Sequence, residues 1–246
     1  MTGLGKRVLI TGGGSGTGAD MARAFHAAGA QVVIAGRRAE ALAAVAEGLP
    51  GVVSVVADVT DEASVAAMFA AAGPCQIVIA NAGAGESAPF ARMPLDQFNR
   101  MIAVNLTGTF LTLRDGLCQM APGGRLIAIA SIAGLRGMAY TAGYAAAKHG
   151  VVGMIKSVAL EVARKGITAN AICPGYIDTE MTDAVVANIM AKTGKSREFA
   201  LASLTATNPQ GRLIAPSEIS SLALWLCSDG AVGVNGQAIA ISGGEG

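Results

Sequence analysis

The feature that most constrains this chain is a regular alternation of short β-branched apolar runs with longer Ala-rich stretches. The apolar runs cover residues 8–10, 31–35, 52–57, 77–80, 126–130, 168–172 and 238–241. Strands that are apolar along their whole length are typical of a parallel sheet covered by helices on both faces. The stretches 19–28, 39–48 and 61–72 are long enough for crossover helices, and Gly29 lies where the first should stop. The pattern predicts a doubly wound α/β fold.

Length and composition limit the classes of protein to which the chain can belong. Its 246 residues are enough for packing alone to stabilise a core, and we expect one domain over residues 1–246. A net charge of +1 offers no broad field to nucleic acid or to an anionic membrane. Hydrophobic residues make up 52% and charged residues 14%, against typical values of ~45–50% and ~25%. This composition favours self-association through an apolar face.

The sequence disfavours membrane insertion, export and metal binding. Mean hydropathy is +0.50, yet Gly and polar residues interrupt every apolar run well before the ~18 residues of a membrane span. The run at residues 8–10 is far shorter than the ~7–15 residues of a signal-peptide core, so we expect a cytoplasmic protein. The 4 cysteines form no C-x-x-C pair and there are only 2 histidines, which predicts reduced thiols and no zinc site.

Residues 179–208 are longer than a simple crossover. They lie between a strand that ends in Pro174-Gly175 and a late helical stretch. Two interpretations stay open, a mobile substrate lid and a pair of ordinary surface helices.

A Gly-rich segment, TGGGSGTG at residues 11–18, follows the first predicted strand and leads directly into a helical pattern. Glycine allows a turn with positive φ and the close approach of a pyrophosphate, while the helix N-terminus attracts negative charge. The segment has no Gly-Lys-Ser/Thr ending, which excludes a Walker loop. We therefore predict a dinucleotide cradle, with a Gly-rich turn that binds nothing as the alternative. Its members are Gly12, Gly14, Ser15, Gly16, Thr17 and Gly18.

The second predicted strand ends in Gly36-Arg37-Arg38, where a carboxylate would bind the adenosine ribose and repel a 2′-phosphate. Two guanidinium groups can instead clamp a 2′-phosphate, so NADP(H) is favoured over NAD(H). Two solvated arginines at a helix start are the alternative. Asp58 follows the third strand and either accepts from the adenine amino group or caps the next helix.

Tyr144 and Lys148 form a Tyr-x-x-x-Lys pair within a helical pattern, so they share a helix face. Ser131 ends a predicted strand, and ligands of open α/β sheets bind at the carboxyl ends of strands. Asn105 is a polar residue in an apolar helical stretch. By itself Asn105 would be interpreted as a structural amide, but the other three make it a candidate catalytic residue.

Taken together, the order and spacing of these motifs resemble the short-chain dehydrogenase/reductase family along the whole chain. The resemblance implies a single-domain, Rossmann-like, seven-stranded parallel sheet with helices on both faces. The matching residues are Thr11, Gly12, Gly16, Gly18, Asp58-Val59, Asn81-Ala82-Gly83, Asn105, Ser131, Tyr144, Lys148, Pro174-Gly175 and Thr179. Thr17 departs from the Ile or Leu usual in the family, which should alter packing more than cofactor binding.

The family's residue roles carry over to these positions. The resemblance implies that Tyr144 is the general acid/base, Ser131 holds the substrate oxygen, Lys148 binds the nicotinamide ribose and Asn105 supports a proton-relay water. It also implies cofactor contacts from Asp58, Val59, Asn81, Ala82, Gly83, Tyr144, Lys148, Pro174, Gly175, Ile177 and Thr179, and a homotetramer.

A tyrosine base needs its pKa lowered from ~10 by about three units at neutral pH. An ammonium at about 4 Å is worth roughly 4 kcal/mol at an effective dielectric of ~20. We therefore expect Lys148 to lower the pKa of Tyr144.

The expected substrate pocket is apolar, with no arginine positioned for a carboxylate. Its residues, by resemblance, include Ala133, Leu135, Met138, Tyr176, Met181 and Met190. The segments 208–213 and 241–244 look like those of family members acting on 3-oxoacyl thioesters, and related alcohol dehydrogenases share such endings. Lys192, Lys195 and Arg197 either meet a CoA or carrier-protein phosphate or form a solvated helix face.

The sequence therefore predicts an NAD(P)-dependent oxidoreductase acting on a 3-oxoacyl thioester and its 3-hydroxyacyl product. A secondary-alcohol dehydrogenase for small or aryl ketones is the alternative, and a non-catalytic NADP-binding sensor is a further one. A serine hydrolase is disfavoured because no G-x-S-x-G elbow occurs and His149 should point around the helix from Tyr144. A methyltransferase would not need the Ser131, Tyr144 and Lys148 set.

Overall fold

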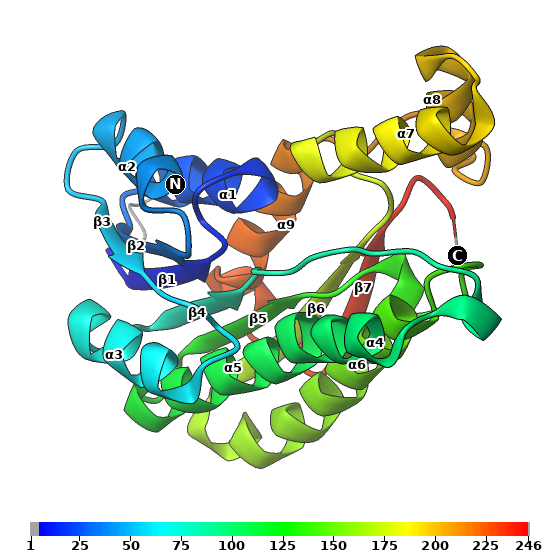
Figure 1. Cartoon of the computed structure of the whole chain (residues 1–246). Coiled ribbons are helices and arrows are strands. Elements are labelled where there is room, and N and C mark those ends of the chain that lie inside the picture. Colours follow the sequence, from blue (N-terminus) through cyan, green and yellow to red (C-terminus); the bar gives the residue numbers. More distant parts are fainter. Residues whose placement is uncertain (1–4, 246) are drawn as a thin grey trace.

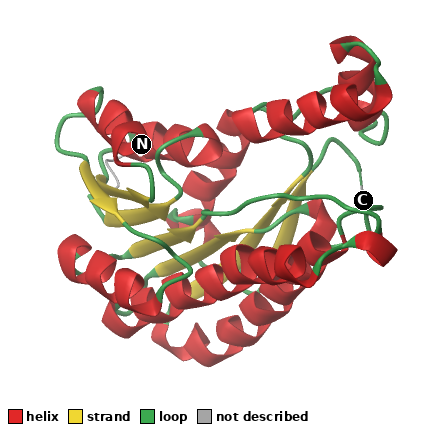
Figure 2. Cartoon of the chain, viewed as in Figure 1, coloured by secondary structure: helices red, strands yellow, loops and turns green. Residues whose placement is uncertain are grey.

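The computed structural model describes residues 5–245, which form a parallel sheet between two layers of helices (Figures 1 and 2). Within these residues the sheet has seven strands in the order β3-β2-β1-β4-β5-β6-β7. The strands are β1 (Arg7–Thr11), β2 (Gln31–Gly36), β3 (Val53–Val56), β4 (Ile77–Ala80), β5 (Arg125–Ile129), β6 (Thr168–Pro174) and β7 (Ala238–Ile241). All paired strands are parallel. The predicted doubly wound α/β fold is confirmed.

Helices of the two layers fill the two faces of the sheet with separate apolar cores. The upper layer in Figure 1 contains α1 (Gly16–Ala27), α2 (Ala39–Glu47) and α9 (Pro216–Leu226). The lower layer contains α3 (Glu62–Ala72), α4 (Leu95–Ile102), α5 (Gly108–Gln119) and α6 (Ala142–Val162). The central strands β4 and β6 are buried along their whole length because both cores contact them. This explains why β4 is continuously apolar, whereas β6 also buries Thr168 and Asn170.

The predicted strand ranges agree with the structure to within two residues at each end. The largest extension is in β6, which continues through Pro174 because its last residues still pair with β7. Gly29 lies just after α1 with φ +82°, a left-handed conformation that glycine adopts without strain. The helix therefore stops where the sequence predicted.

The segment 179–208 forms two helices, α7 (Glu180–Thr193) and α8 (Arg197–Thr205). They project from the carboxyl edge of the sheet as an arm (Figure 1). The arm has a small apolar cluster of its own, which includes Val186, Ala200 and Leu204. No helix in residues 5–245 is long and apolar enough to cross a membrane.

Candidate active site

The Gly-rich segment turns tightly between β1 and α1. Gly12 has φ +68° and Gly16 has φ +49°, so both occupy conformations that favour glycine. At Gly18 an added Cβ would lie 2.1 Å from the Gly12 carbonyl oxygen, which excludes any side chain there. Ser15 begins α1 without capping it through its hydroxyl. The first turn of α1 therefore presents backbone N–H groups, as a phosphate cradle requires.

Asn81 ties the end of β4 to the Gly-rich segment. Its Nδ2 donates to the Thr11 carbonyl over 2.9 Å, and its backbone N–H donates to Thr11 Oγ1 over 3.0 Å. The Ala82 N–H donates to the same Thr11 hydroxyl over 3.1 Å. These bonds fix the segment 81–83 beside the Gly-rich segment.

Arg38 joins the far side of the cradle. Its Nη2 donates to Ser15 Oγ over 2.8 Å, which explains why Ser15 does not cap α1. Arg37 is also exposed and lowers the pKa of Asp58, although hydrogen bonding from Thr60 is the largest cause of that shift. Asp61, and not Asp58, caps α3 by accepting from the Ala63 N–H over 3.0 Å. The helix-cap interpretation of Asp58 is therefore wrong.

Ser131 and Tyr144 come together at the carboxyl end of β5. Ser131 Oγ accepts from the Ala133 N–H over 3.1 Å and lies 3.5 Å from the Pro174 carbonyl, so the side chain is held between β5 and β6. Tyr144 lies in the first turn of α6. Hydrogen bonding to Ser131 lowers the pKa of Tyr144, but burial outweighs this effect and raises it above its ordinary 10.0.

Lys148 follows Tyr144 by one helical turn and is almost completely buried. Its Nζ donates to the Ile129 carbonyl over 2.8 Å and lies 5.6 Å from the centre of the Tyr144 ring. Burial lowers the pKa of Lys148 from 10.5 to about 8. The expectation that Lys148 lowers the pKa of Tyr144 is therefore not met. Burial is the largest cause of both shifts: it raises the pKa of Tyr144 and disfavours the charged form of Lys148.

Asn105 lies where the helical hydrogen-bond ladder is interrupted by a π-turn, Ala103–Thr107, between α4 and α5. Such turns are frequent at functional sites. The side chain is fully buried, donates to the carbonyls of Ala84 (2.9 Å) and Met101 (3.1 Å), and accepts from the Ala84 N–H (3.2 Å). Asn105 thus fixes the loop after β4 on which Gly83 lies.

Gly83 brings three predicted site residues into one place. A Cβ at Gly83 would lie 2.9 Å from Asn105 Oδ1 and 3.8 Å from Lys148 Nζ. Asn105, Gly83 and Lys148 are therefore neighbours although they come from separate parts of the sequence. Val59 is buried, and its side chain packs against Gly108 at the start of α5.

The chain after β6 passes over the cradle. A Cβ added at Gly16 would lie 3.3 Å from Thr179 Cγ2. The start of α7 therefore lies against the Gly-rich segment. Ile177 pairs with Ile214 in an isolated parallel bridge, which fixes the path between Gly175 and Thr179. The predicted cofactor residues after β1, after β4 and after β6 therefore lie at the same edge of the sheet.

The residues expected at the substrate pocket are only partly enclosed. Met138 and Tyr176 are half-buried, whereas Met181 and Met190 on the arm are exposed. Arg197 pairs with Asp183 over 2.8 Å on the arm surface, and Lys195 lies 5.9 Å from the Phe199 ring. These two contacts favour the solvated-face interpretation of the arm's basic residues.

Sequence reasoning missed Gly134, Arg136 and Glu245. A Cβ at Gly134 would lie 2.7 Å from the Lys148 carbonyl, so glycine lets the loop after Ser131 pack directly on α6. Glu245 is buried and its carboxylate contacts Arg136 Nη2 and Thr207 Oγ1. An arginine does therefore lie near the expected pocket. No periodic pattern signals a contact between residues 109 positions apart.

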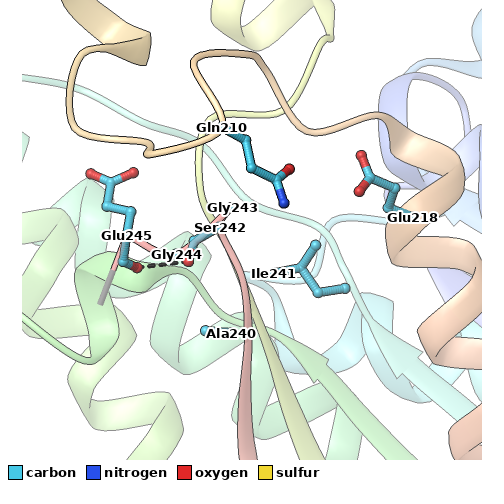
Figure 3. Close-up of a pocket in the computed structure, with 8 residues that line it drawn as sticks. All are labelled: Gln210, Glu218, Ala240, Ile241, Ser242, Gly243, Gly244 and Glu245. Carbon is cyan, nitrogen blue, oxygen red and sulfur yellow. Dashed lines mark hydrogen bonds between the residues drawn. The ribbon is translucent and has the colours of Figure 1, made fainter.

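A pocket of about 440 Å³ lies at the carboxyl end of β7 (Figure 3). It is lined by Gln210, Glu218, Ala240, Ile241, Ser242, Gly243, Gly244 and Glu245. The Glu245 carboxylate points away from Glu218 in this view. Among residues 5–245, no three His, Cys, Asp or Glu side chains are grouped so that they could hold a metal ion.

His149 does not form a hydrolase triad with Ser131. Its Nδ1 lies 2.9 Å from the Ala145 carbonyl one turn earlier in α6, and the side chain is exposed. This position agrees with the prediction that it points around the helix from Tyr144.

Comparisons with known proteins agree with this geometry. A family model described as enoyl-(acyl carrier protein) reductase matches residues 12–245. The chain is 34% identical to D-beta-hydroxybutyrate dehydrogenase of Rhizobium meliloti, covering 97% of this chain and 98% of the relative. It is also 34% identical to the 3-oxoacyl-(acyl-carrier-protein) reductase MabA of Mycobacterium bovis, covering 99% of this chain and 94% of the relative.

A solved structure is equally similar. A variant of actinorhodin polyketide ketoreductase with NADPH superimposes with a TM-score of 0.90 at 34% identity, covering 100% of this chain and 99% of that one. The chain therefore belongs to the short-chain dehydrogenase/reductase family of NAD(P)-dependent oxidoreductases.

Proposed function

We propose that this chain is an NADPH-dependent reductase of 3-oxoacyl thioesters carried on CoA or on an acyl carrier protein. The observation that carries the proposal is the convergence of Ser131, Tyr144 and Lys148 beside the phosphate cradle. Two hydroxyl groups that can bind one oxygen suit a carbonyl substrate. The names of the MabA relative and of the polyketide ketoreductase support a 3-oxoacyl group.

Each of the four candidate catalytic residues has a separate role in carbonyl reduction. A reduced nicotinamide dinucleotide, when bound, supplies the hydride. Tyr144 donates its phenolic proton to the carbonyl oxygen, and the Ser131 hydroxyl donates a hydrogen bond to the same oxygen as negative charge develops. The raised pKa of Tyr144 keeps the phenol protonated at neutral pH, which favours the proton-donor role. Lys148 would hold the nicotinamide ribose, while Asn105 keeps the Gly83 loop against Lys148 and supports the proton-relay water.

The Gly-rich segment would hold the pyrophosphate of either dinucleotide, and Arg37 and Arg38 favour NADPH over NADH. Free N–H groups at the start of α1 would bind the pyrophosphate, and the segment 81–83 with Pro174, Gly175, Ile177 and Thr179 would line the nicotinamide half. Arg38 already donates to Ser15 at the edge of the cradle, and Arg37 extends from the same strand end. Both guanidinium groups are exposed and would clamp a 2′-phosphate.

The helical arm and the helix surfaces support two further expectations. The arm has its own small core, which would let α7 and α8 move as one lid over the substrate. Unchanged limited proteolysis of residues 179–208 on addition of NADPH would exclude the lid.

Leu160 on α6 and Phe110 on α5 are 82% and 44% exposed, which supports assembly into a homotetramer. Light scattering after size exclusion measures that mass directly.

Initial rates with acetoacetyl-CoA, crotonyl-CoA and an aryl methyl ketone, each with NADPH and NADH, test the function. We expect acetoacetyl-CoA with NADPH to give the highest kcat/KM. The crotonyl-CoA arm tests the enoyl reduction for which the family model is described. Preference for the aryl ketone would instead identify a secondary-alcohol dehydrogenase. Tyr144→Phe should abolish turnover and still bind NADPH, whereas NADPH binding without turnover of any substrate by the wild type would identify a sensor.

A further inference from the structure

A buried ion pair lies beside the substrate side of the site. The Glu245 side chain is only 4% exposed and pairs with Arg136 Nη2. Its carboxylate also accepts from Thr207 Oγ1, while its backbone carbonyl accepts from Ser242 Oγ over 2.6 Å. One carboxylate therefore connects the loop after Ser131, the chain after α8 and the C-terminal segment after β7.

The pair is close to the reacting groups. A Cβ added at Gly175 would lie 3.6 Å from Glu245 Oε2. The preceding residue, Pro174, has its carbonyl oxygen 3.5 Å from Ser131 Oγ. Glu245 raises the pKa of Tyr176 and Arg136 lowers it, although burial is the main cause of the raised pKa. Both charges are therefore felt at Tyr176, which in turn acts on Tyr144.

The negative charge of Glu245 neutralises the positive charge of Arg136 at this side of the expected substrate pocket. Arg136 keeps a side-chain exposure of 33%, and its buried Nε has no hydrogen-bond partner among residues 5–245. Without the carboxylate, this guanidinium would be an anion receptor with unpaired donors. With the Glu245 carboxylate in place, this side of the pocket presents the remaining N–H donors of Arg136 and no net charge.

We propose that Glu245 is a specificity-determining residue that neutralises Arg136 and so excludes 3-oxo acids, whose free carboxylate lies next to the reacting ketone, in favour of uncharged 3-oxo esters and thioesters. The inference rests on the proposed function. It also addresses a division among the relatives, which include one named for hydroxybutyrate and one named for 3-oxoacyl-carrier-protein substrates.

Acetoacetate and methyl acetoacetate test the proposal because they present the same ketone with and without a negative charge. We would measure kcat/KM with NADPH for the wild type, Glu245→Gln, Arg136→Met and the double variant. Glu245→Gln should raise the acetoacetate-to-ester ratio about tenfold, a screened charge–charge effect. Arg136→Met should lower the ratio, and the double variant should return it to about the wild-type value. Thr207→Val is the matched control, since it removes a hydrogen bond from the same carboxylate without altering charge.

Binding gives a second readout that does not need turnover. The dissociation constants of 3-hydroxybutyrate and its methyl ester, measured calorimetrically with NADP⁺ present, should change in the same directions. If the wild type reduces neither ketone, the proposed function fails and these dissociation constants alone decide the specificity. If Glu245→Gln changes both members of each pair equally, or if Thr207→Val changes the ratio as much, the proposal is overturned. Circular dichroism of each variant identifies loss of folding, in which case the double variant supplies the comparison.

Discussion

Replacing Lys148 by methionine should stabilise the chain, although it removes a group that we propose to bind the cofactor. Burial lowers the pKa of Lys148 from 10.5 to about 8. At about 1.36 kcal/mol per unit of pKa, keeping this lysine protonated in the folded state near pH 7 costs ~3 kcal/mol. Methionine is apolar and of similar length, so it avoids that cost. It also loses the 2.8 Å hydrogen bond to the Ile129 carbonyl, worth about 1.5 kcal/mol. We expect Lys148→Met to be more stable by about 1–2 kcal/mol at pH 7.

The sign of the pH dependence distinguishes this cause from a general packing effect. Because the folded-state pKa is below the unfolded one, the unfolded chain binds more protons between about pH 8 and 10.5. The wild type therefore regains stability as the pH rises through that window, and the variant does not. From pH 7 to 9.5 the advantage of Lys148→Met should fall by about 2 kcal/mol.

Urea unfolding at pH 7 and pH 9.5 measures the difference. Lys156→Met is the matched control, since Lys156 is an exposed lysine two turns later in α6 and should change stability by no more than about 0.5 kcal/mol at either pH. An equal stability difference between wild type and Lys148→Met at both pH values would refute the reasoning.

Three further substitutions test other parts of the site. Asn105→Leu removes the partners of the Ala84 N–H and carbonyl, so urea unfolding should show a loss of about 2–4 kcal/mol. Gly134→Ala forces a Cβ against the Lys148 carbonyl, and we expect about 1–3 kcal/mol of destabilisation together with a lower kcat, because Ser131 moves relative to α6. Arg38→Ala should raise the KM for NADPH at least tenfold and leave the KM for NADH nearly unchanged in steady-state assays. Equal effects on the two cofactors would return Arg38 to a solvated role.

The periodic and local features of the chain were predictable from sequence. Continuous apolar runs such as 77–80, bounded by turn residues, are typical of strands buried on both faces, and Gly29 indicates a helix end because glycine adopts a positive φ without strain. The Gly-rich segment and the Tyr144–Lys148 spacing are also local, so their elements and approximate bounds followed directly. Residue roles at these positions came from the family resemblance, and they remain proposals.

The electrostatics of the site depended on burial, which no local pattern encodes. The sequence places Lys148 one turn from Tyr144, and an assumed separation of about 4 Å led to a lowered tyrosine pKa. Packing instead buries Lys148, whose Nζ donates to the Ile129 carbonyl, and half-buries Tyr144. Desolvation then dominates, raising one pKa and lowering the other.

The sequence by itself determined the parallel sheet, the Gly-rich turn before α1 and the Tyr144–Lys148 pair on α6, because each depends on residue type at short spacing. Only the tertiary structure decided which distant residues meet. Glu245 reaches Arg136 because β7 lies next to β6 at the sheet edge and the following chain turns back toward the loop after β5. Contacts of this kind depend on strand order and on the directions of loops, which long-range packing selects.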